Sequence, residues 1–137
     1  MTPTSTAPSA SRAGRRRLTK SSDGLTGPQA SLLAQLREAR PDMTVLPEQR
    51  FHETRRWRID LLVSDASGWP GVAVEIQGGI WTGGKHGRGS GLVKDFEKQA
   101  AIAAAGYRFV PVTPQDVKTG VARARILACF SRWHLNA

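Results

Sequence analysis

Two runs of alternating apolar and polar residues, 57–63 and 72–77, form the clearest hydrophobic pattern in the chain. The segment between them, 64–71, is rich in Ser, Asp, Gly and Pro, which favour turns. The pattern therefore predicts a β-hairpin. Successive side chains of a strand point to opposite faces, so each strand has an apolar and a polar face. The predicted core face consists of Trp57, Ile59, Leu61, Val72, Val74 and Ile76.

The polar face of this hairpin brings two acids together. Asp60 and Glu75 lie equally far from a turn centred on residues 67 and 68, so they are predicted to face each other. Opposed like charges are unfavourable, and the pair therefore indicates a cation between them. Mg²⁺ prefers carboxylate oxygens and retains several waters. In the alternative interpretation, Arg58 neutralises both acids on a solvated face, and the hairpin alone leaves both interpretations open.

Helical periodicity is found on both sides of the hairpin. Before it, leucines recur at helical spacing after Pro28, a favoured first residue of a helix, until Pro41 ends the run. After it, segment 92–105 is predicted to be a helix, and Gly106 suits the left-handed position that follows a helix. The predicted core-facing side of this second helix consists of Leu92, Phe96, Gln99, Ala100 and Ala103.

Two further strands and a C-terminal helical region complete the predicted order. Residues 45–51 are expected to open the sheet, with Pro47 favouring an edge position. Residues 107–112 follow the second helix as a strand, so a right-handed crossover within one mixed sheet is expected. Thr113-Pro114-Gln115-Asp116 has the pattern of a helix start, and a last helix is expected over about 121–130. The predicted fold is α/β, a mixed sheet flanked by helices in the order α-β-β-β-α-β-α.

The charge balance favours a polyanionic partner. The chain of 137 residues carries 20 Lys+Arg against 11 Asp+Glu, which gives a formal net charge of +9. Nucleic acid is the first candidate partner, and the length suits one domain. No apolar run is long enough to span a bilayer, no apolar stretch follows the N-terminal arginines, and the single Cys129 excludes an internal disulfide. We therefore expect a cytoplasmic protein with no membrane partner.

Residues 1–27 differ from the rest in composition. They are rich in Ser, Thr, Pro and Ala and contain five basic residues with few large apolar ones. Such a segment cannot support packing, so we predict a disordered basic tail followed by a folded domain over residues 28–137. The tail has two interpretations: an arm that adds phosphate contacts, or a solubilising leader.

Basic residues are concentrated before and after the hairpin. Those in segment 51–58 lie close in sequence to the acids, where arginines are placed to meet phosphates. Segment 78–91 contains seven of the 14 glycines. Glycine permits close backbone approach to phosphate oxygens, and although a flexible linker has the same composition, a loop that leaves directly from a strand favours substrate binding. The candidate nucleic-acid contacts are Arg55, Arg56, Arg58, Lys85, His86, Arg88 and Lys94.

The order of these features resembles that of a known superfamily. The likeness covers about residues 51–113, and it rests on Asp60, on Glu75-Ile76-Gln77 after a hairpin turn, and on Asp95 and Lys98 in the next helix. This arrangement resembles the PD-(D/E)XK nuclease superfamily, especially small phage and bacterial endonuclease-like proteins related to very-short-patch repair enzymes. The resemblance implies a restriction-endonuclease-like fold and Mg²⁺- or Mn²⁺-dependent cleavage of DNA phosphodiesters. It also implies that Asp60, Glu75 and the carbonyl of Ile76 bind the metal.

The chain departs from the superfamily pattern at two positions. Gln77 stands where the family has a lysine, and an amide cannot supply a positive charge. Lys98 on the next helix is our candidate for that charge, with Lys85 or His86 of the loop as others; in the alternative interpretation, Lys98 is a surface lysine paired with Glu97 or Asp95. An acid that relatives often carry on the first helix, near Ala30, is absent, which weakens a second metal site.

The predicted catalytic residues are thus Asp60, Glu75, Gln77 and Lys98. The main rival function is a nucleic-acid-binding protein that keeps the fold but has lost cleavage. A basic structural protein with salt-bridged acids is a more distant alternative. A branched DNA substrate would suit a homodimer best.

Overall fold

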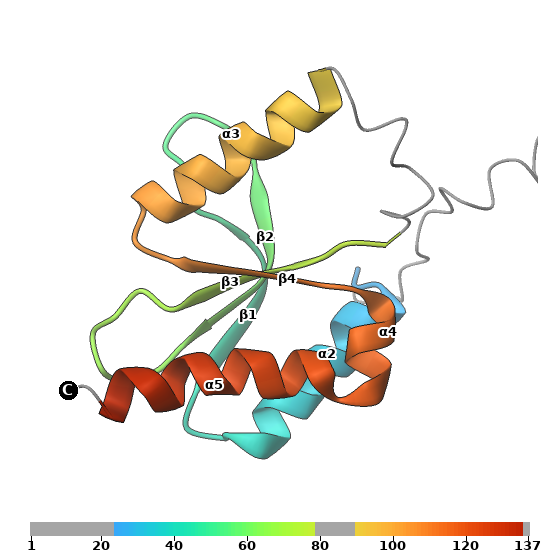
Figure 1. Cartoon of the computed structure of the whole chain (residues 1–137), viewed down its shortest axis with the longest axis vertical. Coiled ribbons are helices and arrows are strands. Elements are labelled where there is room, and N and C mark those ends of the chain that lie inside the picture. The colour runs from blue at the N-terminus through green and yellow to red at the C-terminus, as the bar shows by residue number, and fades with distance from the viewer. Residues whose placement is uncertain (1–23, 79–89, 136–137) are drawn as a thin grey trace, which may run out of the picture.

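A four-stranded mixed sheet lies at the centre of the computed structural model, which describes residues 24–78 and 90–135 (Figure 1). The strands lie side by side in chain order. Helices α2, α4 and α5 cover one face of the sheet, and α3 covers the other (Figure 1). The strands are β1 (Thr44–Arg50), β2 (Arg58–Ser64), β3 (Val72–Ile76) and β4 (Arg108–Val112). The helices are α2 (Gly27–Ala39), α3 (Ser90–Ala104), α4 (Pro114–Thr119) and α5 (Val121–Leu135).

The strand pairing confirms the predicted hairpin and the mixed sheet. β1 pairs antiparallel with β2, β2 antiparallel with β3, and β3 parallel with β4. Helix α3 connects the two parallel strands, as a crossover must. β1 is at the edge of the sheet, which is where Pro47 is tolerated. The C-terminal region contains two helices within the described residues, one more than the predicted order allowed.

The main core fills the space between the sheet and helices α2 and α5. The predicted core residues Val72 and Val74 are fully buried there, and Ile76 packs against them. From the helices, Leu32 and Leu36 of α2 meet Val112, Val117, Ala122, Ile126 and Phe130 of the C-terminal half. This core layer packs against one face of β3 and so fixes the position of the strand.

The opposite face of the sheet is also buried, and here the sequence prediction was wrong. Ala73, which alternates with Val72 and Val74 and was therefore left out of the predicted core face, is fully buried in a second cluster with Ile59 and with Ile102 of α3. Leu61, expected beside Ile59, belongs to the main core instead. The alternation of faces along β2 therefore breaks between these two residues, at Asp60.

Helix α3 is rotated relative to the prediction. Phe96, assigned to the core, is 57% exposed, and Ala100 and Ala103 are exposed as well. Ile102 is the fully buried side chain, and Lys98 is partly buried on the same side of the helix. The helix therefore packs on the sheet through a narrow strip and turns most of its apolar face outward.

The helix ends follow the sequence signals closely. Thr26 and Gln29 form a capping box at the start of α2, with Pro28 in its first turn. Thr113 and Asp116 form another at α4, and Gly106 has the left-handed φ of 93° expected after α3.

Leu25, placed in the predicted tail, is buried, so the folded part starts before residue 28. Residues 1–23 of the predicted tail and the loop residues Lys85, His86 and Arg88 lie outside the described residues. Across residues 24–78 and 90–135, no helix is both long and apolar enough to cross a membrane.

Candidate functional site

The two predicted acids meet at the ends of β2 and β3. The β2–β3 register pairs Leu61 with Val74, which puts Asp60 opposite Glu75. The backbone N–H of Asp60 donates to Glu75 Oε2 at 3.3 Å, and the N–H of Ile76 donates to Asp60 Oδ2 at 2.8 Å. A backbone N–H of each strand therefore donates a hydrogen bond to the carboxylate carried by the other strand. The predicted opposition of Asp60 and Glu75 is confirmed.

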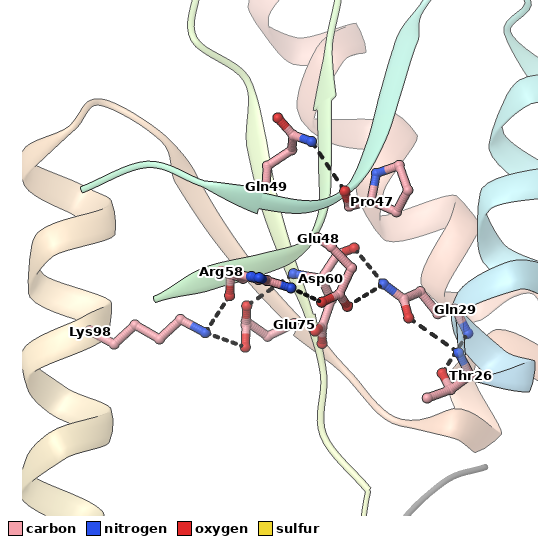
Figure 2. Close-up of polar contacts among 9 residues, drawn as sticks. All are labelled: Thr26, Gln29, Pro47, Glu48, Gln49, Arg58, Asp60, Glu75 and Lys98. Carbon is pink, nitrogen blue, oxygen red and sulfur yellow. Dashed lines mark hydrogen bonds and ion pairs between the residues drawn. The ribbon is translucent and has the colours of Figure 1, made fainter. Parts of the chain in front are cut away.

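Lys98 reaches this pair from α3. Its Nζ donates to Glu75 Oε1 at 3.0 Å and to the carbonyl oxygen of Arg58 at 2.7 Å (Figure 2). The side chains of Lys98 and Glu75 are only 21% and 16% exposed. Glu97, the alternative partner, instead pairs with Arg55 at 3.3 Å. Lys98 is thus a cation of the acid site and not a surface lysine paired along its own helix.

Glu75 is electrostatically strained in this setting. Burial raises the pKa of its carboxyl above the usual value, and the charge of Asp60 raises it further. The charge and hydrogen bond of Lys98 oppose this increase, as does the N–H of Asp60. The ionised form of Glu75 therefore depends on a nearby cation, which Lys98 supplies in this structure.

A residue that the sequence analysis missed, Gln29, fixes the backbone beneath Asp60. Gln29 is 3% exposed and is the one buried polar residue of the part that the structure describes. Its Nε2 donates to the carbonyl oxygen of Asp60 and to Glu48 Oε2, each at 2.9 Å (Figure 2). Its Oε1 accepts the N–H of Thr26 at 3.3 Å. The capping box is visible in the sequence, but the contact with Asp60 spans the fold and has no local signal.

Glu48 of β1 is a third acid beside the pair, and it was also missed. The register of β1 and β2 places it opposite Asp60, and its φ is +55°. A glutamate in this region is uncommon, and such strain occurs often at functional sites. Arg58, proposed in one interpretation to neutralise Asp60 and Glu75, makes its ion pair with Glu48 at 3.6 Å.

The remaining predicted site residues are spread around this centre. Gln77 follows β3 and donates its backbone N–H to the carbonyl oxygen of Val112 at 2.7 Å. It lines a cleft of about 520 Å³ with β4, α4 and Arg125, and no described contact joins its side chain to the acids. The carbonyl of Ile76 belongs to the strand that carries Glu75, as the predicted ligand set requires.

The predicted DNA-contacting arginines lie in the β1–β2 connection and at the start of β2. Arg55 stacks its guanidinium over Trp57 at 3.9 Å from the ring centre and pairs with Glu97, so its charge is partly neutralised. Trp57 in turn stacks on Phe51. Arg56 and Arg58 are exposed. Lys94 is on α3, but its side chain lies outside the described part.

No group of three or more His, Cys, Asp or Glu side chains suited to a metal ion occurs among the described residues. Two facing carboxylates are nevertheless enough for Mg²⁺, which retains several of its waters. The raised pKa of Glu75 also fits a site that gains from an added cation. The donor set is thus compatible with one hard divalent ion.

Comparison of the chain with protein families, with curated proteins and with solved structures finds no match.

Proposed function

We propose that this protein is a Mg²⁺-dependent DNA endonuclease with a restriction-endonuclease-like fold, a member of the PD-(D/E)XK superfamily. The observation that carries the proposal is the meeting of Asp60, Glu75 and Lys98 from β2, β3 and α3. Two opposed acids and one lysine are the groups needed to bind a metal and to stabilise negative charge on a phosphate. They come together although Gln77 occupies the usual lysine position.

Each group has a distinct role in this proposal. Asp60, Glu75 and the carbonyl of Ile76 would hold Mg²⁺, and a metal ion bound there would supply polarisation of the phosphate and a lower pKa for the attacking water. Lys98 supplies the cation for the developing negative charge, and its bond to the Arg58 carbonyl keeps Nζ directed at the site. Gln29 keeps the backbone of Asp60 in position. The net charge of +9 and the exposed Arg56 and Arg58 favour a DNA backbone.

A second candidate is a nucleic-acid-binding protein that keeps this fold without cleavage. The observation in its favour is the Lys98–Glu75 ion pair, because it already supplies Glu75 with a cation in the absence of metal. In this case the acids and Lys98 are a structural network, and divalent ions have little effect.

A cleavage assay separates the two candidates. Purified protein is incubated with supercoiled, linear and branched DNA in Mg²⁺, Mn²⁺, Ca²⁺ or EDTA. We expect cleavage in Mg²⁺ or Mn²⁺ only, and we expect Asp60→Asn and Glu75→Gln each to abolish it while DNA binding in Ca²⁺ persists. Glu53→Gln, at an exposed acid outside the site, is the matched control and should cleave normally. Wild-type cleavage by either site variant would refute the endonuclease proposal, and binding without cleavage in every metal would favour the second candidate.

A further inference from the structure

The outward face of α3 carries an apolar stripe that nothing in the described fold covers. Val93 and Phe96 are 53% and 57% exposed, and they are the two most exposed large apolar residues of the described part. Ala100 and Ala103 continue the same side of the helix and are also exposed. The spacing of these four residues, i, i+3, i+7 and i+10, is that of a helix packing against another helix. We call them the α3 stripe.

The charges around the α3 stripe do not suit DNA. The exposed charged side chains described on α3 are the acids Asp95 and Glu97, whereas Lys98 is turned inward to Glu75. Glu97 is in turn neutralised by Arg55. In a chain of net charge +9, this is a surface where two copies can approach with little repulsion and where a polyanion gains little.

The α3 stripe is also complementary to itself. Its N-terminal half carries the bulky Val93 and Phe96, and its C-terminal half carries alanines. When two such helices meet antiparallel across a two-fold axis, each bulky half lies on the small residues of the other copy, and the backbones can approach closely. We propose that two copies of this chain form a dimer through antiparallel packing of their α3 helices, with Phe96 on the partner's Ala100 and Val93 on the partner's Ala103.

The size of the α3 stripe predicts a weak dimer. Two stripes of this length bury on the order of 700 Å², less than the roughly 1,200–2,000 Å² of standard interfaces, so we expect a weak dimer whose population depends on protein concentration. This inference does not depend on the proposed nuclease activity, because only the surface of α3 is involved.

Sedimentation equilibrium measures the association directly. The mass should rise from 14.9 kDa toward twice that value with increasing concentration. Phe96→Ser should weaken association about tenfold or more, because central aromatic anchors dominate interfaces. Val121→Ser, at an exposed apolar residue of α5 on the opposite layer, is the matched control and should leave the mass curve unchanged. A monomer at every concentration would overturn the proposal. A lower melting temperature of dilute Phe96→Ser protein would do so as well, because the stripe would then pack within its own chain.

Disulfide trapping tests the antiparallel register. In a Cys129→Ser background, the double variant Val93→Cys/Ala103→Cys should form covalent dimers on mild oxidation. The two positions are about 15 Å apart along one helix, too far for a bond within one chain. Neither single variant should crosslink. Crosslinking of either single variant would exclude antiparallel packing in this register, because each single cysteine would then lie about 15 Å along the helix axis from its counterpart in the other copy.

Discussion

Lys98→Met tests whether Lys98 acts as the resident cation of the acid pair. Methionine keeps much of the apolar stem but removes Nζ, and with it the 3.0 Å bond to Glu75 and the 2.7 Å bond to the Arg58 carbonyl. Hydrogen bonds to charged groups contribute about 1.5–3 kcal/mol when buried, and exposed ion pairs at most about 1 kcal/mol. With 21% and 16% of the two side chains exposed, we expect a loss of about 2 kcal/mol in the free energy of unfolding near neutral pH.

This loss should depend on pH in a defined direction. The pKa of Glu75 is already raised in the folded protein, and removal of Lys98 takes away a group that lowers it. The destabilisation is complete above the folded-state pKa, where Glu75 must be charged without its cation. It shrinks as the pH falls through the raised pKa of the variant toward that of the folded wild type, because the folded variant then binds a proton more tightly than the folded wild type does.

Lys98→Met should raise the affinity for a divalent metal ion, although it lowers the stability of the fold. In the wild type, a divalent ion competes with Lys98 for Glu75, so removal of the lysine frees the carboxylate. If the freed carboxylate makes the free energy of metal binding more favourable by about 1–2 kcal/mol, the variant binds the metal roughly 5–30-fold more tightly than the wild type. Lys98→Met should therefore show a larger metal-induced rise in melting temperature than the wild type while its cleavage rate falls.

Thermal and chemical unfolding of wild type and variant give the required values, measured near pH 5 and pH 8, with EDTA and with titrated Mn²⁺. Lys118→Met, at an exposed lysine of α4, is the matched control and should match the wild type throughout. The reasoning is refuted if Lys98→Met is as stable as the wild type near pH 8, or if its metal-induced shift is the smaller one.

Two further predictions concern Gln29, beneath Asp60, and Gly71, which precedes β3. Gln29→Ala leaves the Asp60 carbonyl and Glu48 without their buried donor, so urea unfolding should show a loss of about 2–3 kcal/mol. The hydrogen bond that Gln35 donates to Ser31, elsewhere on α2, is unaffected. Gly71→Ala should cost more than about 2 kcal/mol, because this glycine has a φ of +114° and a Cβ there would collide with the Val63 carbonyl. Gly27→Ala, at an open position of ordinary φ, is its control; equal stability of the two alanine variants would contradict the prediction.

The sequence was sufficient for the hairpin because the information is local. The turn residues and the alternation on either side set the register, and the register alone places Asp60 opposite Glu75. Gln29 and Glu48 were not predicted because they belong to other elements, and their contacts with Asp60 depend on how α2 and β1 pack. Ala73 was misassigned because an alanine among valines does not reveal that both faces of a strand are covered.

The error on α3 has a physical cause that connects the candidate site to the α3 stripe. Two residue sets on this helix have core-like spacing, and periodicity favours the one that contains Phe96. Ile102 lies one turn from Lys98, so burial of Ile102 on the sheet also turns Lys98 toward Glu75. Phe96 is two residues from Lys98, about 200° around the helix, and must then face outward. The rotation that supplies the acid pair with its lysine is therefore the same rotation that exposes the surface we assign to the dimer, and a helix turned to bury Phe96 would leave Glu75 without its cation.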